Sequence, residues 1–140
     1  TGKYLTFFDE KLGQLYFNLY DVEGGKIEKR PIFHIQHLLS YHYSKDGFSL
    51  ITSVQNNGKT DIAIYQIVGN SFTYITNDLA NDIRPQYVDN DTKVVFSSNR
   101  NTDQINADND TLFSKTYDLY IYDLKTKKLT RLTNTPDANE

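Results

Sequence analysis

One segment of this chain returns later in the chain with nearly the same pattern. The segment Asp61–Asn77 (DIAIYQIVGNSFTYITN) is echoed by Asp118–Asn134 (DLYIYDLKTKKLTRLTN), which begins 57 positions later. A repeated supersecondary unit sets the architecture of a whole chain, because each copy buries its apolar face only by packing on its neighbours. The sequence therefore predicts a stack of similar units, and the functional question becomes which surface that stack presents.

Further copies give the length of the unit. The block Tyr43–Thr52 matches Tyr87–Phe96 at a spacing of 44 positions, and Tyr20–Lys29 aligns with Tyr122–Arg131. The spacings of 57 and 44 differ by 13 residues, all of which fall in the Asn- and Asp-rich segment 99–117. A period of about 44 residues with one inserted loop is typical of the four-stranded blades of a β-propeller.

Each unit is predicted to be built of β-strands. Short runs rich in β-branched residues at 50–54 and 94–98 follow the turn signals Asp46-Gly47 and Asn90-Asp91. We expect the Asp-Gly pair to form a tight hairpin with positive φ at both central positions. No stretch has a sustained helical period, and only 34–39 is ambiguous. The predicted fold is all-β, with about three blades of four antiparallel strands each.

The phase of the repeat predicts the organisation of the chain as a partial β-propeller over residues 1–140. Residues 1–38 are expected to form a partial blade that lacks its first strand, residues 39–82 a full blade, and residues 83–140 a full blade with an inserted loop at 99–117. Three blades in an open stack leave two sheet faces uncovered. We therefore expect either a segment of a larger propeller of six to eight blades, or a homodimer that completes a six-bladed ring.

Composition excludes several classes of function. The net charge of −3 is spread along the chain, so it indicates neither a nucleic-acid groove nor a basic membrane patch. The chain has no Cys, which excludes disulfides and thiolate-bound zinc. No apolar run approaches the roughly 20 residues of a membrane span, so we expect no membrane insertion.

The repeated blocks resemble the TolB-like propeller repeat. In that family an aromatic residue precedes Ser-Pro-Asp-Gly, and an apolar strand closes in Phe-x-Ser-x-Arg before Asp-Ile-Tyr-x-Tyr-Asp and Leu-Thr-x-Leu-Thr. The matching blocks here are Phe96–Arg100 (FSSNR), Asp118–Asp123 (DLYIYD) and Leu129–Thr133 (LTRLT). In Tyr43–Gly47 (YSKDG) a Tyr replaces the Trp and a Lys replaces the Pro, and Asp89–Asp91 lacks the Gly, so its turn is altered.

The resemblance implies a propeller of six, seven or eight blades of the kind found in bacterial periplasmic and outer-membrane-associated proteins. On that basis we expect a non-enzymatic scaffold of the bacterial envelope that binds a protein or peptidoglycan-associated partner. The same repeat type also occurs in the propellers of prolyl-oligopeptidase-like and tricorn-like peptidases, where it gates or docks substrates. The alternative is therefore a substrate-gating propeller whose catalytic domain lies outside this chain, because fold alone does not decide function.

The inserted loop contains the candidate metal ligands. Asn106, Asp108 and Asp110 stand at alternate positions and offer oxygen ligands for Ca²⁺, as the first half of an EF-type loop does. Thr111 stands where such a loop has Gly, and Tyr117 stands at the twelfth position, where it has an acidic residue. A solvated loop, or a recognition loop on the binding face, is the alternative. We expect the loops 99–116 and 55–60 to carry partner contacts.

Other polar residues have simpler interpretations. His34, His37 and His42 lie close in sequence but lack an acidic fourth partner for zinc, so we expect structural or exposed histidines. No Gly-x-Ser-x-Gly elbow surrounds a serine, and Ser97-Ser98 ends a repeat strand, so no catalytic residue is assigned.

The acidic and basic residues that recur with the repeat are interpreted as structural. Asp61 and Asp118 stand at strand starts, where an aspartate hydrogen-bonds to nearby backbone amides. Arg100 follows an apolar strand and is expected to brace neighbouring blades by hydrogen bonding and stacking.

Overall fold

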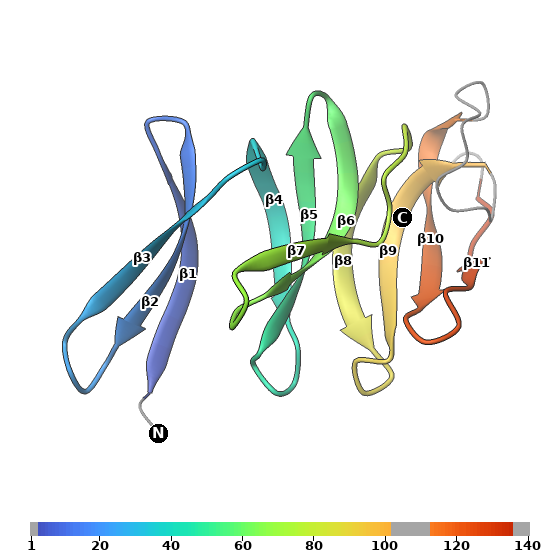
Figure 1. Cartoon of the computed structure of the whole chain (residues 1–140). Helices are drawn as coiled ribbons and strands as arrows, with labels where there is room; N and C mark the ends of the chain where they lie inside the picture. Colours follow the sequence, from blue (N-terminus) through green and yellow to red (C-terminus); the bar gives the residue numbers. More distant parts are fainter. Residues whose placement is uncertain (1–2, 102–112, 136–140) are drawn as a thin grey trace.

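The computed structural model describes residues 3–101 and 113–135, and their fold is all-β. The strands form three antiparallel sheets, arranged side by side as about three propeller blades (Figure 1). The first sheet contains β1 (Tyr4–Lys11), β2 (Gln14–Asp21) and β3 (Ile27–Ile32). The second contains β4 (His37–Tyr43), β5 (Ser49–Asn56), β6 (Lys59–Gln66) and β7 (Ser71–Tyr74). The third contains β8 (Asp82–Val88), β9 (Lys93–Arg100), β10 (Phe113–Asp123) and β11 (Leu129–Arg131).

Strand boundaries and one turn differ from the sequence prediction. The ambiguous stretch 34–39 is a link followed by the start of β4 at His37. The Asp46-Gly47 turn has positive φ only at Gly47 (+76°), so the expectation of two such positions was wrong there. The β8–β9 turn contains no Gly, and its residues Asp89, Asn90 and Asp91 all have positive φ (52°, 54° and 62°). The chain thus adopts the left-handed conformation in that turn with residues that favour it less than Gly does.

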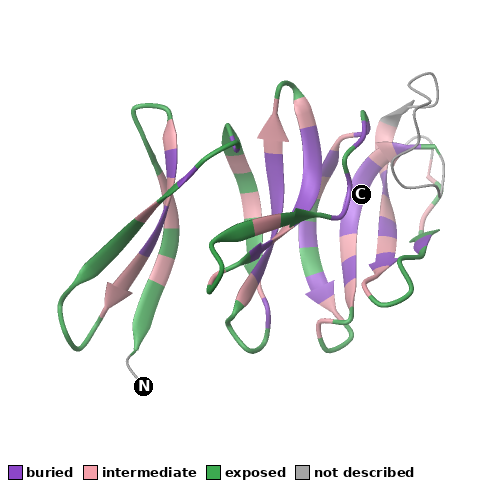
Figure 2. Ribbon diagram, viewed as in Figure 1, coloured by how far each residue is buried: buried purple, intermediate pink, exposed green. Residues whose placement is uncertain are grey.

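The sheets pack face to face through aromatic and branched side chains. Tyr65 on β6 is fully buried and lies 4.9 Å, ring centroid to ring centroid, from Phe17 on β2. Between the second and third sheets, Ile51 and Ile62 pack in one cluster with Val94 and Phe96. Figure 2 shows the resulting gradient, in which buried positions dominate β5, β6 and β9, whereas β1 and β3 of the first sheet are mostly exposed and β2 is buried to half-buried.

One tyrosine on the first strand of each four-stranded sheet reaches back to the preceding sheet. The Tyr43 hydroxyl donates to the Thr6 carbonyl at 2.9 Å, and the Tyr87 hydroxyl lies 3.0 Å from Ser49 Oγ. These tyrosines are 44 positions apart, so a tyrosine hydroxyl that reaches the preceding sheet is repeated with the period of the sequence, although its partner is a backbone carbonyl in one case and a serine hydroxyl in the other. The inter-sheet contact is therefore a repeated feature of the fold.

Two opposite ends of the sheets differ in what they contain. The β1–β2 turn, the β5–β6 turn and the links 33–36 and 75–81 lie at the end drawn uppermost in Figure 1, which we call the upper face. The turns that follow β4, β6 and β8 lie at the opposite, lower face. None of the described segments is a helix capable of crossing a lipid bilayer.

Candidate functional site

The β5–β6 turn at Asn57-Gly58 forms the centre of the upper face. Both residues have positive φ (52° and 77°), which is the two-residue hairpin geometry that an Asn-Gly pair favours. The link before β4 holds this turn from one side. Gln36 donates its backbone N–H to Asn56 Oδ1 at 2.7 Å, and its Oε1 accepts from the Asn57 backbone N–H at 2.8 Å.

Residues of the second sheet and its following link hold the turn from the other side. Asn56 Nδ2 donates to the Tyr74 hydroxyl at 2.9 Å, and Lys59 Nζ donates to Asn77 Oδ1 at 2.8 Å. The turn is therefore fixed on two sides while Asn57 stays exposed. We call this group the Asn57 turn site, and its members are Gln36, Asn56, Asn57, Lys59, Tyr74 and Asn77.

Two hollows flank the Asn57 turn. One, of about 460 Å³, is lined by Gly13, His34, Ile35, Gln36, Asn56 and Asn57. The other, of about 250 Å³, is lined by Asn56, Asn57, Lys59, Asp61, Tyr74 and Asn77. Both hollows share the two asparagines, and amide side chains both donate and accept hydrogen bonds. The site can therefore pair with groups that, like peptide bonds, need a donor and an acceptor together.

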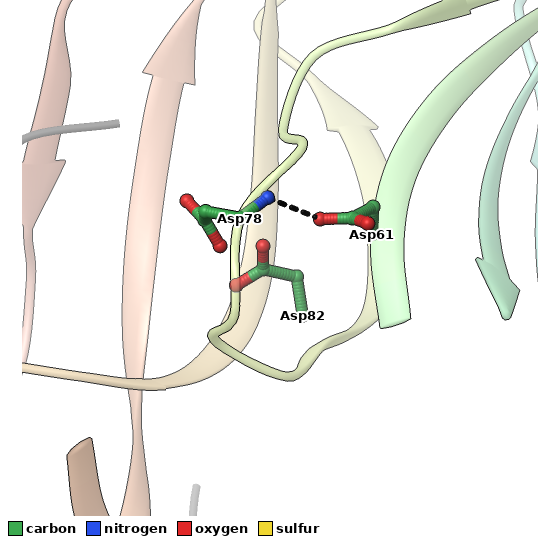
Figure 3. A group of neighbouring side chains, drawn as sticks. All are labelled: Asp61, Asp78 and Asp82. Carbon is green, nitrogen blue, oxygen red and sulfur yellow. Dashed lines mark hydrogen bonds between the residues drawn. The ribbon is translucent and has the colours of Figure 1, made fainter. Parts of the chain in front are cut away.

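A buried group of carboxylates lies behind the second hollow. Asp61, Asp78 and Asp82 each place a carboxylate oxygen within 4.8 Å of the others, as Figure 3 shows. The Asp78 backbone N–H donates to Asp61 Oδ1 at 3.0 Å, so the link 75–81 is tied to the start of β6. Carboxylates in this arrangement are potential ligands for a hard cation.

Arg100 already supplies a cation to two of these carboxylates. Its Nη2 lies 2.7 Å from Asp82 Oδ2 and 3.1 Å from Asp78 Oδ2, and the three side chains are at most 6% exposed. Its Nε donates to Ser98 Oγ at 2.9 Å. Arg100 on the third sheet is thus bonded to Asp78, which belongs to the link that joins the second and third sheets, and this contact is the bracing that the sequence predicted.

Burial sets the protonation of this network. Removal from water raises the pKa of Asp82 to about 6, although the neighbouring Arg100 charge acts in the opposite direction. Burial also raises the pKa of Asp61, although the hydrogen bond from the Asp78 backbone N–H acts in the opposite direction. The network therefore holds a carboxylate that takes up a proton in mildly acidic solution.

Asp61 on β6 and Asp118 on β10 make the same contacts in the two four-stranded sheets, although β10 begins at Phe113, so the expectation that Asp118 stands at a strand start was wrong. Thr76 Oγ1 bonds to Asp61 Oδ1, and Thr133 Oγ1 bonds to Asp118 Oδ1, each at 3.3 Å. Asp118 also accepts the Thr135 backbone N–H at 2.9 Å, as Asp61 accepts that of Asp78. The expected bonds to backbone amides are present, but these amides lie 17 residues downstream.

The two aspartates differ in charge environment. Arg131 Nη2 contacts the Asp118 carboxylate directly. Burial acts to raise the pKa of Asp118, but the hydrogen bonds from Thr135 and Arg131 outweigh it, so that pKa is lowered. Burial dominates at Asp61, where the cation that acts on the carboxylate is Lys59, and its pKa is raised instead. Repeat-equivalent residues thus share a structural role with opposite pKa shifts.

The remaining predicted sites are placed as follows. The calcium ligands proposed at Asn106, Asp108 and Asp110 lie outside the described residues. The histidines are exposed and are not part of the one group of three potential ligands found in the described residues. His37 Nδ1 lies 3.4 Å from Glu10 Oε1, and His42 Nδ1 accepts the Tyr87 backbone N–H at 3.3 Å.

Sequence reasoning missed the partners of Arg100. Asp78 lies in the seven-residue link 75–81 between β7 and β8, just beyond the repeated segment Asp61–Asn77, and Asp82 is the first residue of β8. The available signal was charge, because a buried arginine at the end of an apolar strand is paired with carboxylates, and Asp78 and Asp82 stand just before and at the start of the third sheet.

Comparison with solved structures identifies the fold. TolB from Acinetobacter baumannii aligns with a TM-score of 0.68 at 19% identity, over 95% of this chain and 30% of TolB. The tricorn protease aligns with a TM-score of 0.63 at 14% identity, over 92% of this chain and 12% of the protease. Puromycin hydrolase aligns with a TM-score of 0.61 at 10% identity, over 92% of this chain and 20% of the hydrolase. The sequence matches no protein-family model and no curated protein.

The chain thus has a TolB-like β-propeller-type fold and spans less than a third of each of these three proteins.

Proposed function

We propose that this chain is part of a non-enzymatic propeller scaffold that docks a protein partner on its upper face. The observation that carries the proposal is the Asn57 turn, which is hydrogen-bonded from Gln36 on one side and through Lys59 to Asn77 on the other. A binding loop that is already ordered loses less conformational entropy when its partner arrives. Insertions in repeat proteins also tend to mark the binding face, and this chain has an insertion in segment 99–117, which supports a binding role for the protein.

The chemistry of the site indicates the kind of partner. The two hollows beside Asn57 are lined by four amide side chains, together with Lys59, Asp61, Tyr74, His34, Ile35 and Gly13. An extended polar segment of a protein offers alternating carbonyl and N–H groups that suit amide side chains. The partner is therefore a protein segment, free or carried by a peptidoglycan-associated protein. We place the protein in the periplasm or at the outer membrane, on the basis of the likeness to TolB.

The second candidate function is that of a substrate-gating propeller of a peptidase. The similarity to the tricorn protease and to puromycin hydrolase favours it. In that case the protein isolated from its source would carry a hydrolase domain beyond this chain. Assay of that protein on chromogenic peptides containing proline separates the two functions: turnover above the blank supports the peptidase, and its absence supports the scaffold.

Site-directed photocrosslinking tests the scaffold directly. A photoreactive residue replaces Asn57 on the upper face, and in a control it replaces Val68, which is 86% exposed in the β6–β7 turn on the lower face. Both proteins are expressed in the source cells and irradiated. The proposal predicts a discrete crosslinked protein from position 57 that is missing from position 68. Equal crosslinking from both positions, or none from position 57, contradicts it.

A further inference from the structure

The outer edge of the second sheet is formed by β7, whose backbone is open on one side. β7 is the last strand of its sheet, and in the described part of the chain it pairs only with β6. Ile75, the next residue, donates its backbone N–H to the Ile62 carbonyl at 2.8 Å. Because bonded and non-bonded pairs alternate along an antiparallel ladder, Phe72 and Tyr74 direct their N–H and C=O groups toward the open edge.

The equivalent strands of the other two sheets carry charge where β7 carries none. Tyr74 stands at the position that Lys29 occupies in β3 and Arg131 in β11. Over its whole length β3 reads Ile-Glu-Lys-Arg-Pro-Ile, whereas β7 reads Ser-Phe-Thr-Tyr. Charged residues and proline on an outer strand discourage the addition of a further strand. β7 contains neither, so its open edge suits pairing with another polypeptide.

A pocket lies beside this edge, between the first and second sheets. It has a volume of about 370 Å³ and is lined by Asn70, Phe72 and Tyr74 of the second sheet and by the segment 31–35. Within that segment Phe33 is 65% exposed, whereas both isoleucines are buried. None of the residues that line the described pocket is Lys, Arg, Asp or Glu. The pocket is therefore suited to a large apolar side chain rather than to a charged one.

The open edge and the pocket share two residues. Phe72 and Tyr74 offer their backbone groups to the edge and also line the pocket. Side chains of directly opposite residues in an antiparallel pair lie on the same face of the sheet. A strand added at this edge would therefore place the side chain opposite Phe72 or Tyr74 at the pocket. In recognition by strand addition, main-chain hydrogen bonds supply affinity, and such a pocket selects the sequence.

We propose that β7 receives an extended segment of a partner protein as an added antiparallel strand, and that one aromatic or large aliphatic side chain of this segment fills the pocket. The occupant is a polypeptide, because only a strand matches the row of N–H and C=O groups along the edge. Antiparallel pairing continues the order of the sheet. The inference does not depend on docking at the Asn57 turn, because here the backbone edge and apolar side chains recognise the partner.

Short peptides test both the pairing and the pocket. The probe is an end-capped heptapeptide, Thr-Val-Thr-Phe-Thr-Val-Thr, which carries Phe and both Val on one face when it is extended. Calorimetric titration into the 140-residue chain is expected to show binding that is lost when Ser replaces the central Phe. Absence of binding by the Phe peptide, or equal affinity for the Ser peptide, overturns the proposal.

Backbone methylation of the probe tests the strand addition itself. The central residue faces the open edge, so the second, fourth and sixth backbone nitrogens of the probe donate toward β7. Methylation of these three nitrogens should abolish binding, whereas methylation of the third and fifth, which point away, should preserve it. The same affinity for the two methylated peptides would exclude a paired strand.

Two phenylalanine variants locate the probe on the chain. Phe33→Ala shortens a side chain that lines the pocket and is expected to weaken binding about tenfold. Phe48→Ala is the matched control, because Phe48 is 63% exposed in the turn after β4 on the lower face, and it should bind as the wild type does. Circular dichroism checks the folding of both variants. Equal affinities of the two variants overturn the proposal, and so does a wild-type dimer, seen by light scattering, that the probe dissociates.

Discussion

Removing the Arg100 side chain should destabilise the fold strongly and in a pH-dependent way. Arg100→Met deletes a guanidinium that is 2% exposed and leaves Asp82, which is fully buried, without its cation. Breaking a buried ion pair by removing one partner costs about 3–5 kcal/mol, because an uncompensated charge stays buried. We expect a loss of about 4 kcal/mol in the free energy of unfolding at pH 8.

The loss should be smaller in mild acid. The pKa of Asp82 is about 6 with Arg100 in place, and removing the positive charge raises it further. At pH 5 the carboxyl is therefore protonated in the variant, and about 1.4 kcal/mol of the penalty disappears for each pH unit below that pKa. The double variant Arg100→Met with Asp82→Asn should recover part of the loss at pH 8, because it removes the unpaired charge.

Urea denaturation followed by far-ultraviolet circular dichroism measures these free energies, and the chain offers no Trp as a fluorescent reporter. Arg84→Met is the matched control, because Arg84 is exposed, and it should change stability by less than about 0.5 kcal/mol. A loss below about 1 kcal/mol for Arg100→Met at pH 8, or a larger loss at pH 5 than at pH 8, would refute the reasoning.

Three further predictions concern separate features. Because the pKa of Asp82 rises from 3.8 to about 6 on folding, the folded state binds a proton that the unfolded state releases between these values. Wild-type stability should therefore fall by about 2 kcal/mol from pH 4 to pH 7 relative to Asp82→Asn in urea titrations; a parallel pH profile for the two proteins would exclude it. Leu12 is 99% exposed and has a φ of +52°, and the equivalent position of the β5–β6 hairpin is Asn57. Because Asn tolerates the left-handed conformation better than Leu, Leu12→Asn should stabilise the chain by about 1 kcal/mol. A lowered melting temperature would contradict the assigned turn. If Asn106, Asp108 and Asp110 bind Ca²⁺, calorimetric titration should give heat in the wild type that is lost in Asp108→Ala, and no heat in the wild type would leave the loop without a calcium role.

The repeat made most of the fold predictable from sequence. The 44-residue spacing placed the strands of the second and third sheets, and it also related Tyr43 to Tyr87. Their partners Thr6 and Ser49 were not predictable, because each contact crosses to the preceding sheet and depends on how far the sheets are offset. Sequence periodicity gives the strands of a sheet, whereas sheet-to-sheet contacts are set by tertiary packing.

The candidate site was predictable only in part. The expectation that Arg100 braces the blades followed from its place after an apolar strand, but Asp78 lies within, and Asp82 directly after, a link whose path no periodicity specifies. The loop 55–60 was expected to contact a partner, and the structure adds that its Asn57 turn is fixed by Gln36, which had no signal in the sequence. The Asp46-Gly47 turn was predicted wrongly, because a dipeptide favours a turn type without determining it.

The central claim is that one sheet-to-sheet interface is repeated along the chain. Nuclear Overhauser effects between side chains of adjacent sheets test it most directly. We predict cross-peaks between the Phe17 and Tyr65 rings, whose centroids are 4.9 Å apart, and between the Tyr87 ring and the Ser49 β protons at the next interface. Cross-peaks at one interface without the other, or at neither, would contradict a repeated interface.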